Sequence, residues 1–155
     1  MKLPEKLLFL DIDGVLNSED WLYRSGMTFS SNRLDHLDPQ ACRLLNDVLE
    51  QTSCGLILSS SWRYICTPSQ VQTLLHKRGC AKAQFYGHTP RLGDQDDRRG
   101  KEIAKWLEVT QWQGTFAIVD DGDDMGELRP RLVRTKWSTG LTRTEAQALV
   151  SLLNQ

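Results

Sequence analysis

Two aspartates separated by one residue follow an apolar run near the start of the chain, in the segment LLFLDIDGVLN at 7–17. Asp11 and Asp13 are like charges that must lie close together. This arrangement costs free energy unless a cation, or a reaction that uses both acids, offsets it. The pair therefore indicates a metal site or a reaction that needs two carboxylates.

Polar side chains also follow two later apolar runs, GLILS at 55–59 and TFAIV at 115–119. The residues after these runs are Ser59, Ser60, Ser61, Trp62 and Arg63 in the first case, and Asp120, Asp121, Asp123 and Asp124 in the second. A basic segment, RRGK at 98–101, opens a predicted helix that leads into the second run. Acids, hydroxyls and cations thus recur at corresponding places along the chain.

Short apolar runs alternate with helical patterns along the whole sequence. We predict strands at 7–11, 55–59, 82–86, 115–119 and 131–135. Predicted helices between them begin at N-caps or capping boxes: Asp38 before Pro39, Thr67 with Gln70, and Thr142 with Glu145. This alternation predicts an α/β fold with a parallel sheet between two layers of helices. Because ligands bind beyond the carboxyl ends of such strands, we expect the polar groups to converge there.

Bulk properties exclude several classes of protein. The chain has 155 residues, 39% of them hydrophobic, and a net charge of −1, so no global basic field indicates a protein that coats nucleic acid. Four cysteines without a CxxC pair argue against a zinc site. No apolar run suits a signal peptide or a membrane span. We expect one domain over residues 1–155, in the cytoplasm and without a membrane partner.

The order of motifs resembles the haloacid dehalogenase (HAD) superfamily of phosphohydrolases. FLDIDGVLN, LILSS, DDRRGKEI and FAIVDDGDDM are similar to its four motifs, and the resemblance covers the chain from Leu7 to about Leu149. Within the superfamily, the chain looks most like the capless HAD domains of RNA-repair enzymes. The Asp97-to-Lys101 spacing also resembles the phosphatase half of polynucleotide kinase/phosphatase. The resemblance implies a three-layer, Rossmann-like HAD fold with about five strands.

The resemblance also implies roles for single residues. Asp11 is expected to be the nucleophile that forms an aspartyl-phosphate, and Asp13 the general acid and then the base. Ser59 is expected to donate a hydrogen bond to a phosphoryl oxygen, with help from backbone near Ser60. Trp62 and Arg63 are expected to touch the rest of the substrate.

A magnesium ion is the implied cofactor, since it would neutralise carboxylate and phosphate charges. Its expected ligands are the Asp11 carboxylate, the Asp13 backbone carbonyl and an acid from the fourth motif, with Asp120 first and Asp121 second. A cation must also hold the phosphate. Arg99 and Lys101 both qualify, and the sequence leaves that choice open.

No stretch is long enough for a cap domain, because 18–37 reads as a loop and 64–97 is used by a helix, a strand and a loop. An open site suits a large substrate, so we expect a phosphatase acting on phosphorylated RNA or DNA ends or on nucleotides. The alternatives are an idle HAD-like module that binds a phosphorylated partner, and a phosphatase of small metabolites or phosphoproteins. The sequence gives no indication of an oligomer and does not distinguish a 3′ from a 5′ end.

Overall fold

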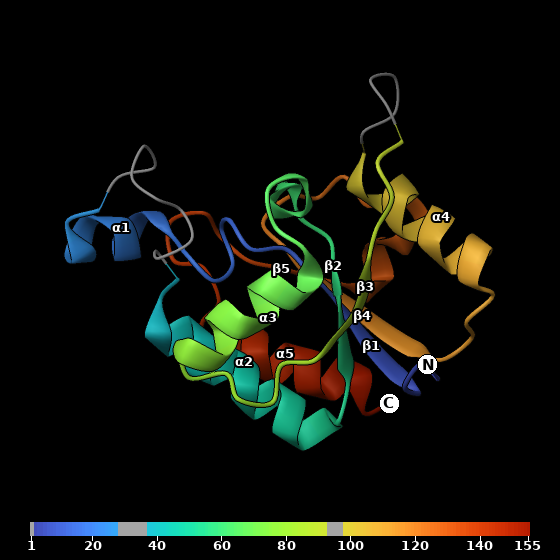
Figure 1. Ribbon diagram of the computed structural model, residues 1–155, viewed down its shortest axis with the longest axis horizontal. Coiled ribbons are helices and arrows are strands. Elements are labelled where there is room, and N and C mark those ends of the chain that lie inside the picture. The colour runs from blue at the N-terminus through green and yellow to red at the C-terminus, as the bar shows by residue number, and fades with distance from the viewer. Residues whose placement is uncertain (1, 28–36, 93–97) are drawn as a thin grey trace.

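A five-stranded parallel sheet forms the centre of the protein. The computed structural model describes residues 2–27, 37–92 and 98–155. The strands are β1 (Lys6–Leu10), β2 (Gly55–Leu58), β3 (Phe85–His88), β4 (Thr115–Asp120) and β5 (Leu132–Arg134). They lie in the order β3-β2-β1-β4-β5, and every neighbouring pair is parallel (Figure 1). The predicted parallel α/β sheet is confirmed.

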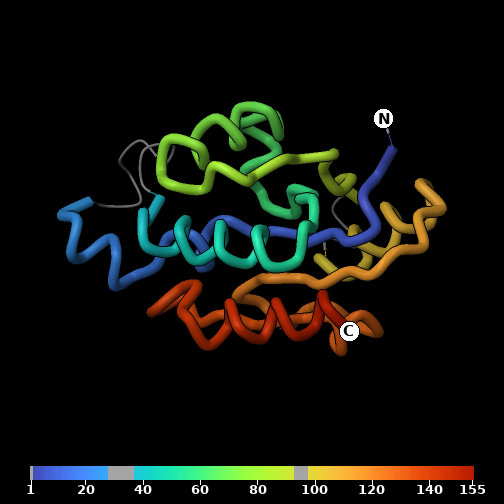
Figure 2. Tube along the Cα trace, turned by 90° about the horizontal axis from the view of Figure 1, so that it is seen from below, coloured from blue at the N-terminus to red at the C-terminus, as the bar shows by residue number. Residues whose placement is uncertain are grey.

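Helices cover both faces of this sheet. The α-helices are α1 (Glu19–Ser25), α2 (Pro39–Thr52), α3 (Pro68–Lys77), α4 (Arg99–Thr110) and α5 (Arg143–Leu153). Two 3₁₀ helices, η2 (Ser61–Tyr64) and η3 (Gly126–Arg131), follow β2 and precede β5. Figure 2 shows α2 in cyan and α5 in red side by side, and these two helices are in contact. Helix α4 lies on the opposite side of the sheet (Figure 1).

Alternate residues of β1 divide the core into two layers. Leu8 and Leu10 belong to the cluster that β1 shares with α2, α3 and α5, whereas Phe9 belongs to the cluster on the α4 side. The Phe9 ring meets Trp106 of α4 edge to face, with ring centroids 5.4 Å apart. Because all these side chains are buried, each contributes about 1.5–3 kcal/mol to folding. The three-layer architecture predicted from the sequence is therefore confirmed.

The helix starts follow the predicted capping signals. Asp38 accepts a hydrogen bond from the Gln40 backbone N–H at 2.9 Å and caps α2. Capping boxes start α3, at Thr67, and α5, at Thr142. Local hydrogen bonds of this kind satisfy backbone N–H groups that the first helical turn leaves without partners.

Strand β3 begins three residues later than predicted. The prediction was 82–86, and the strand runs from Phe85 to His88. The backbone before it is occupied in closing α3: the Cys80 N–H donates to Leu75 O at 2.9 Å and the Ala83 N–H to Cys80 O at 3.3 Å. Residues engaged in that turn cannot join the sheet, so pairing with β2 starts only after it.

Part of the predicted loop 18–37 forms a helix instead. Helix α1 is capped at its start by Ser18, whose Oγ accepts the Trp21 N–H at 3.1 Å, and ends at Gly26, whose φ is +72°. The described residues between β1 and α2 contain no other helix, and those between α3 and α4 contain only β3. No cap domain is present in the described part of the chain, and in that part every helix is too short or too polar to cross a lipid bilayer.

The start of α4 packs directly against the loop that follows β4. A Cβ atom at Gly100 would collide with the Met125 backbone carbonyl, and the Gly100 N–H donates to Asp124 O at 3.0 Å. Glycine at this position thus sets how closely α4 approaches the loop.

We predict that Gly100→Ala lowers the melting temperature, although alanine is intrinsically the better helix former. The backbone must shift to admit the methyl group, which typically costs about 1–3 kcal/mol. At this chain length about 1 kcal/mol corresponds to roughly 2–4 °C. Thermal unfolding followed by circular dichroism measures the change, with Val109→Ala, an exposed site on α4, as control. A Gly100→Ala protein that melts with the parent would contradict the prediction.

Candidate active site

The register of the sheet aligns three polar residues in one row. Leu10 on β1 pairs with Leu58 on β2 and with Val119 on β4. The next residue on each strand is polar, namely Asp11, Ser59 and Asp120. Backbone hydrogen bonds fix this alignment, since the Asp11 N–H donates to Val119 O at 3.1 Å and the Ser59 N–H to Leu10 O at 2.9 Å. The candidate active site lies at this edge of the sheet.

Three carboxylates form the centre of the site. One oxygen from each of Asp11, Asp120 and Asp121 lies within 4.8 Å of the others. Asp11 and Asp120 are buried, and Asp121 is half-buried. Gly14 makes this proximity possible: its φ is +82°, and a Cβ atom there would collide with the Asp121 carboxylate. The arrangement is a compact set of oxygen ligands, the type that hard divalent cations bind.

Burial raises the cost of ionising this cluster. The pKa of Asp11 lies well above its usual value, first because the group is desolvated and second because Asp120 is close. Desolvation also raises the pKa of Asp120 to about 6, although the Gly122 N–H and the Arg99 guanidinium act in the opposite direction. Like charges clustered in a buried place, with Arg99 as a counter-charge to Asp120, still favour binding of a further cation.

Asp13 is oriented by two side chains. Its Oδ1 accepts hydrogen bonds from Asn17 Nδ2 at 2.8 Å and from Trp62 Nε1 at 3.1 Å. Asn17 Oδ1 in turn accepts the Gly14 N–H at 2.9 Å, closing the turn after β1. Asn17 is not among the residues expected from the sequence; its signal is a polar residue directly after the apolar pair Val15 and Leu16.

The two serines after β2 have different surroundings. Ser59 Oγ is buried and has no hydrogen-bond partner among the described residues. Ser60 Oγ accepts the Trp62 N–H at 3.2 Å and caps η2. Because a buried hydroxyl without a partner is costly, Ser59 is suited to donate to a ligand.

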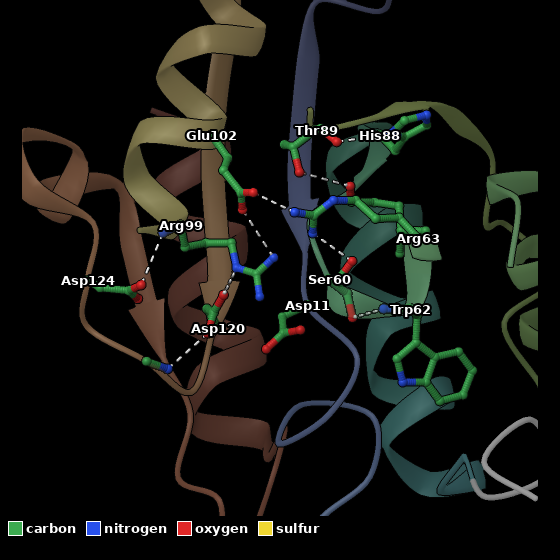
Figure 3. Close-up of polar contacts among 12 residues, drawn as sticks. Asp11, Ser60, Trp62, Arg63, His88, Thr89, Arg99, Glu102, Asp120 and Asp124 are labelled. Atoms are coloured by element: carbon green, nitrogen blue, oxygen red, sulfur yellow. Dashed lines mark hydrogen bonds and ion pairs between the residues drawn. The ribbon is translucent and has the colours of Figure 1, made fainter. Parts of the chain in front are cut away.

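Arg99 and Lys101, the two candidate third-motif cations, occupy different sides of α4. Arg99 Nε lies 3.5 Å from Asp120 Oδ2, and its guanidinium points toward the carboxylates (Figure 3). Lys101 is exposed and lines a surface cavity with Glu127. The geometry brings Arg99, and not Lys101, to the acid cluster. Asp124 accepts the Arg99 backbone N–H at 3.0 Å, so it caps α4 beside the cluster.

A buried glutamate joins two arginines behind the site. Glu102 Oε2 contacts Arg63 Nη2 at 2.5 Å, and Glu102 Oε1 lies 3.6 Å from Arg99 Nη1 (Figure 3). The Glu102 and Arg63 side chains are only 3% and 4% exposed, so solvent screens this pair little. Glu102 was not identified from the sequence, although an acid on the same helix face as Trp106 signals a buried ionic contact.

Trp62 and Arg63, expected to touch substrate, are both turned inward. Trp62 is fully buried. The Arg63 guanidinium donates from Nη1 to Ser60 O at 2.7 Å while it contacts Glu102. Both side chains thus orient groups of the site rather than line its open side.

We predict that Asp120→Asn stabilises the metal-free protein. Since the folded-state pKa of Asp120 is raised to about 6 from the usual 3.8, ionisation costs folding free energy; this cost is absent below about pH 4 and complete above about pH 6. Asparagine removes the charge and retains an oxygen for the Gly122 N–H. In EDTA, the difference between the melting temperatures of the variant and the parent should therefore increase by several degrees as the pH rises from 4 to 7. Asp47→Asn, at an exposed site on α2, should show no such pH-dependent gain, and an equal gain there would refute the explanation.

Comparisons with known proteins place the chain in a family. The HAD domain of Swiss Army Knife RNA repair proteins matches residues 7–146. A solved structure, a haloacid dehalogenase-like family hydrolase from Streptococcus pneumoniae, aligns over 94% of this chain and 90% of its own with 13% identity and a TM-score of 0.47. No curated protein sequence matches significantly. With 140 consecutive residues matched to the family, from 7 to 146, the chain belongs to the HAD domains of the type found in Swiss Army Knife RNA repair proteins.

Proposed function

We propose that this protein is a magnesium-dependent phosphatase that removes phosphate from RNA or DNA ends or from nucleotides through an aspartyl-phosphate. Membership of the HAD superfamily implies phosphohydrolase-type chemistry. The observation that carries the proposal is the convergence of three carboxylates within 4.8 Å, one of them Asp11, beside the Arg99 guanidinium. The unpartnered Ser59 hydroxyl at the same edge supports it.

The carboxylate cluster fits a magnesium site. Asp11, Asp120 and Asp121 would hold the ion through their clustered carboxylate oxygens, and the Asp13 backbone carbonyl is a further candidate ligand. When bound, the ion supplies positive charge that offsets the repulsion between these carboxylates and a phosphate. The raised pKa values of Asp11 and Asp120 in the metal-free protein are in line with such a role.

In the first step, an Asp11 carboxylate oxygen attacks phosphorus and the bond from phosphorus to the leaving oxygen breaks. Asp13 gives its proton to that oxygen. Because Asp13 Oδ1 already accepts hydrogen bonds from Asn17 and Trp62, we place the proton on Oδ2. Ser59 Oγ and the Arg99 guanidinium donate to the phosphoryl oxygens and stabilise their charge.

In the second step, water hydrolyses the aspartyl-phosphate. The Asp13 carboxylate accepts a proton from water, the water oxygen attacks phosphorus, and the phosphorus–oxygen bond to Asp11 breaks. Inorganic phosphate leaves, Asp11 is again a carboxylate, and Asp13 again carries its proton. The fixed orientation of Asp13 lets one group serve both proton transfers without moving.

A nucleic-acid or nucleotide substrate is favoured by the RNA-repair family to which the chain belongs. The absence of a cap domain from the described residues also favours substrates too large to be enclosed.

We predict magnesium-dependent release of phosphate that is lost in Asp11→Asn. Colorimetric assay of inorganic phosphate would compare acetyl phosphate, nucleoside monophosphates, and RNA and DNA oligonucleotides phosphorylated at either end, each with MgCl₂ or EDTA. Asparagine retains the shape of Asp11 and removes its nucleophilic charge, so turnover should fall by at least about a thousandfold. Melting with and without MgCl₂ provides a second readout, because a ligand that binds the folded state raises the melting temperature. No release from any substrate by the folded parent would refute the phosphatase and favour a phosphate-binding module.

We predict that Glu102→Gln lowers kcat more than it raises KM. The change removes the charge that Arg63 and Arg99 share, so Arg99 loses one of the two carboxylates that position its guanidinium. A misplaced group of this kind typically costs about tenfold to a hundredfold in rate. Steady-state hydrolysis of acetyl phosphate measures the effect. Glu108→Gln, an exposed change on the same helix, is the matched control. A Glu102→Gln enzyme with the kcat of the parent would show that Arg99 is held without Glu102.

A further inference from the structure

An exposed aromatic residue lies beside the candidate active site. Tyr64, at the end of η2, is 52% exposed, and the next residue, Ile65, is 59% exposed. Tyr64 lies five residues after Ser59, in the segment that continues the chain from the candidate active site at the carboxyl end of β2. Packing of the hydrophobic core does not account for two exposed apolar side chains at this place.

Two arginines hold the Tyr64 ring in place. Arg63 Nη2 donates to the Tyr64 hydroxyl at 3.0 Å, and the Arg63 guanidinium carbon lies 4.7 Å from the ring centroid. The guanidinium carbon of Arg91, an exposed residue after β3, lies 5.0 Å from the same centroid. Because Arg63 is itself fixed by Glu102, the ring is positioned before any ligand arrives. Ordering a side chain in advance reduces the entropic cost of binding.

Arg63 also fixes the position of this ring relative to the phosphate site. One guanidinium contacts both Ser60 O, at 2.7 Å from Nη1, and the Tyr64 hydroxyl, at 3.0 Å from Nη2. The exposed ring is therefore only one guanidinium away from the backbone next to Ser59. On this basis we place a nucleotide joined to a phosphate at Ser59 and Asp11 within reach of the ring.

We propose that Tyr64 and Arg91 form a stacking site for the bases next to the phosphorylated end of a single-stranded nucleic acid. The inference rests on the proposed function and assigns its substrate class. Unpaired bases stack on aromatic rings and on guanidinium planes, and here a half-exposed ring lies next to the exposed Arg91. Paired bases in a duplex do not expose their faces, so a single strand is the better ligand.

The charge of this surface is in line with a nucleic-acid ligand. The segments 61–66 and 88–92 contain no acidic residue, and Arg91 is exposed there, whereas the charge of Arg63 is buried and paired with Glu102. The whole chain carries a net charge of −1, however, and Asp94 follows closely after Arg91 in the sequence. Binding should therefore depend on stacking more than on phosphate attraction, with a shallow dependence of affinity on salt.

The test compares a substrate that contains nucleobases with one that contains none. Steady-state rates would be measured for single-stranded octanucleotides phosphorylated at the end that the parent prefers, and for acetyl phosphate. Tyr64→Leu removes the ring, Tyr64→Phe retains the ring without the hydroxyl, and Tyr23→Leu removes an 89%-exposed tyrosine on α1 as matched control.

We expect Tyr64→Leu to lower kcat/KM for the oligonucleotide at least about tenfold more than kcat/KM for acetyl phosphate, as loss of one stacked base implies. Tyr64→Phe should retain most of the oligonucleotide activity. Equal losses on both substrates would show that Tyr64 only supports Arg63, and loss in Tyr23→Leu alone would place the strand over α1; either result overturns the proposal.

Binding to Asp11→Asn separates this inference from the proposed function. Fluorescence anisotropy of a labelled, phosphorylated octanucleotide should show the same Tyr64 dependence even if no substrate is turned over. Phosphate release without any effect of Tyr64→Leu would leave a phosphatase and remove the stacking site. A phosphopeptide that binds more tightly than the octanucleotide, and with dependence on Tyr64, would overturn the choice of nucleic acid.

Discussion

The desolvation of Asp11 and Asp120 is the constraint on which the rest of the site depends. Both carboxyl groups are buried at the end of neighbouring strands, and their pKa values are raised mainly because water is excluded. Among the residues that the structure describes, the Arg99 guanidinium forms an ion pair with Asp120, and a single positive charge is too little for three clustered acids. A site that leaves negative charge poorly compensated is unstable by itself and receptive to a cation.

A second ionic group lies behind the first. Glu102 shares its charge between Arg63 and Arg99, and it thereby connects η2 to the start of α4. These two segments follow different strands: η2 comes directly after the second motif, and the start of α4 belongs to the third. Burial makes the contact sensitive to geometry, because a buried charge that loses its partner is costly. Arg63 also donates a hydrogen bond to the Tyr64 hydroxyl, so the exposed Tyr64 ring is connected to the buried Glu102 contacts.

Much of this architecture could be predicted from the sequence because its signals are local. Apolar runs and capping residues gave the parallel sheet and the starts of α2, α3 and α5. Helix α1 was missed even though Ser18 and Gly26 are a typical N-cap and C-cap, because the segment lacks a long apolar face. The late start of β3 depends on the turn that closes α3. The hydrogen bonds of that turn cannot be predicted from the strand or helix propensities of its residues.

The site was predictable only as far as strand ends determine it. The row of Asp11, Ser59 and Asp120 follows from the order of the elements. The choice between Arg99 and Lys101 depends on helix rotation, since two residues differ by about 200° around the axis. Arg99 lies on the same face of α4 as the buried residues Ile103 and Trp106. The apolar pattern of the helix therefore indicates which of the two cations faces the sheet. The contacts of Glu102 and Asn17 are long-range or turn-specific side-chain bonds, which sequence spacing does not report.

The pairing of Leu10 with Leu58 and Val119 has a consequence for how such a chain can vary in length. Inserting or deleting one residue within β1 would exchange the two faces of the strand, and it would also move Asp11 out of the row. The packing of both core layers and the alignment of the chemical groups would be lost together. Changes in length are therefore tolerable in the connections, such as the segment around α1, whereas the central strands must keep theirs.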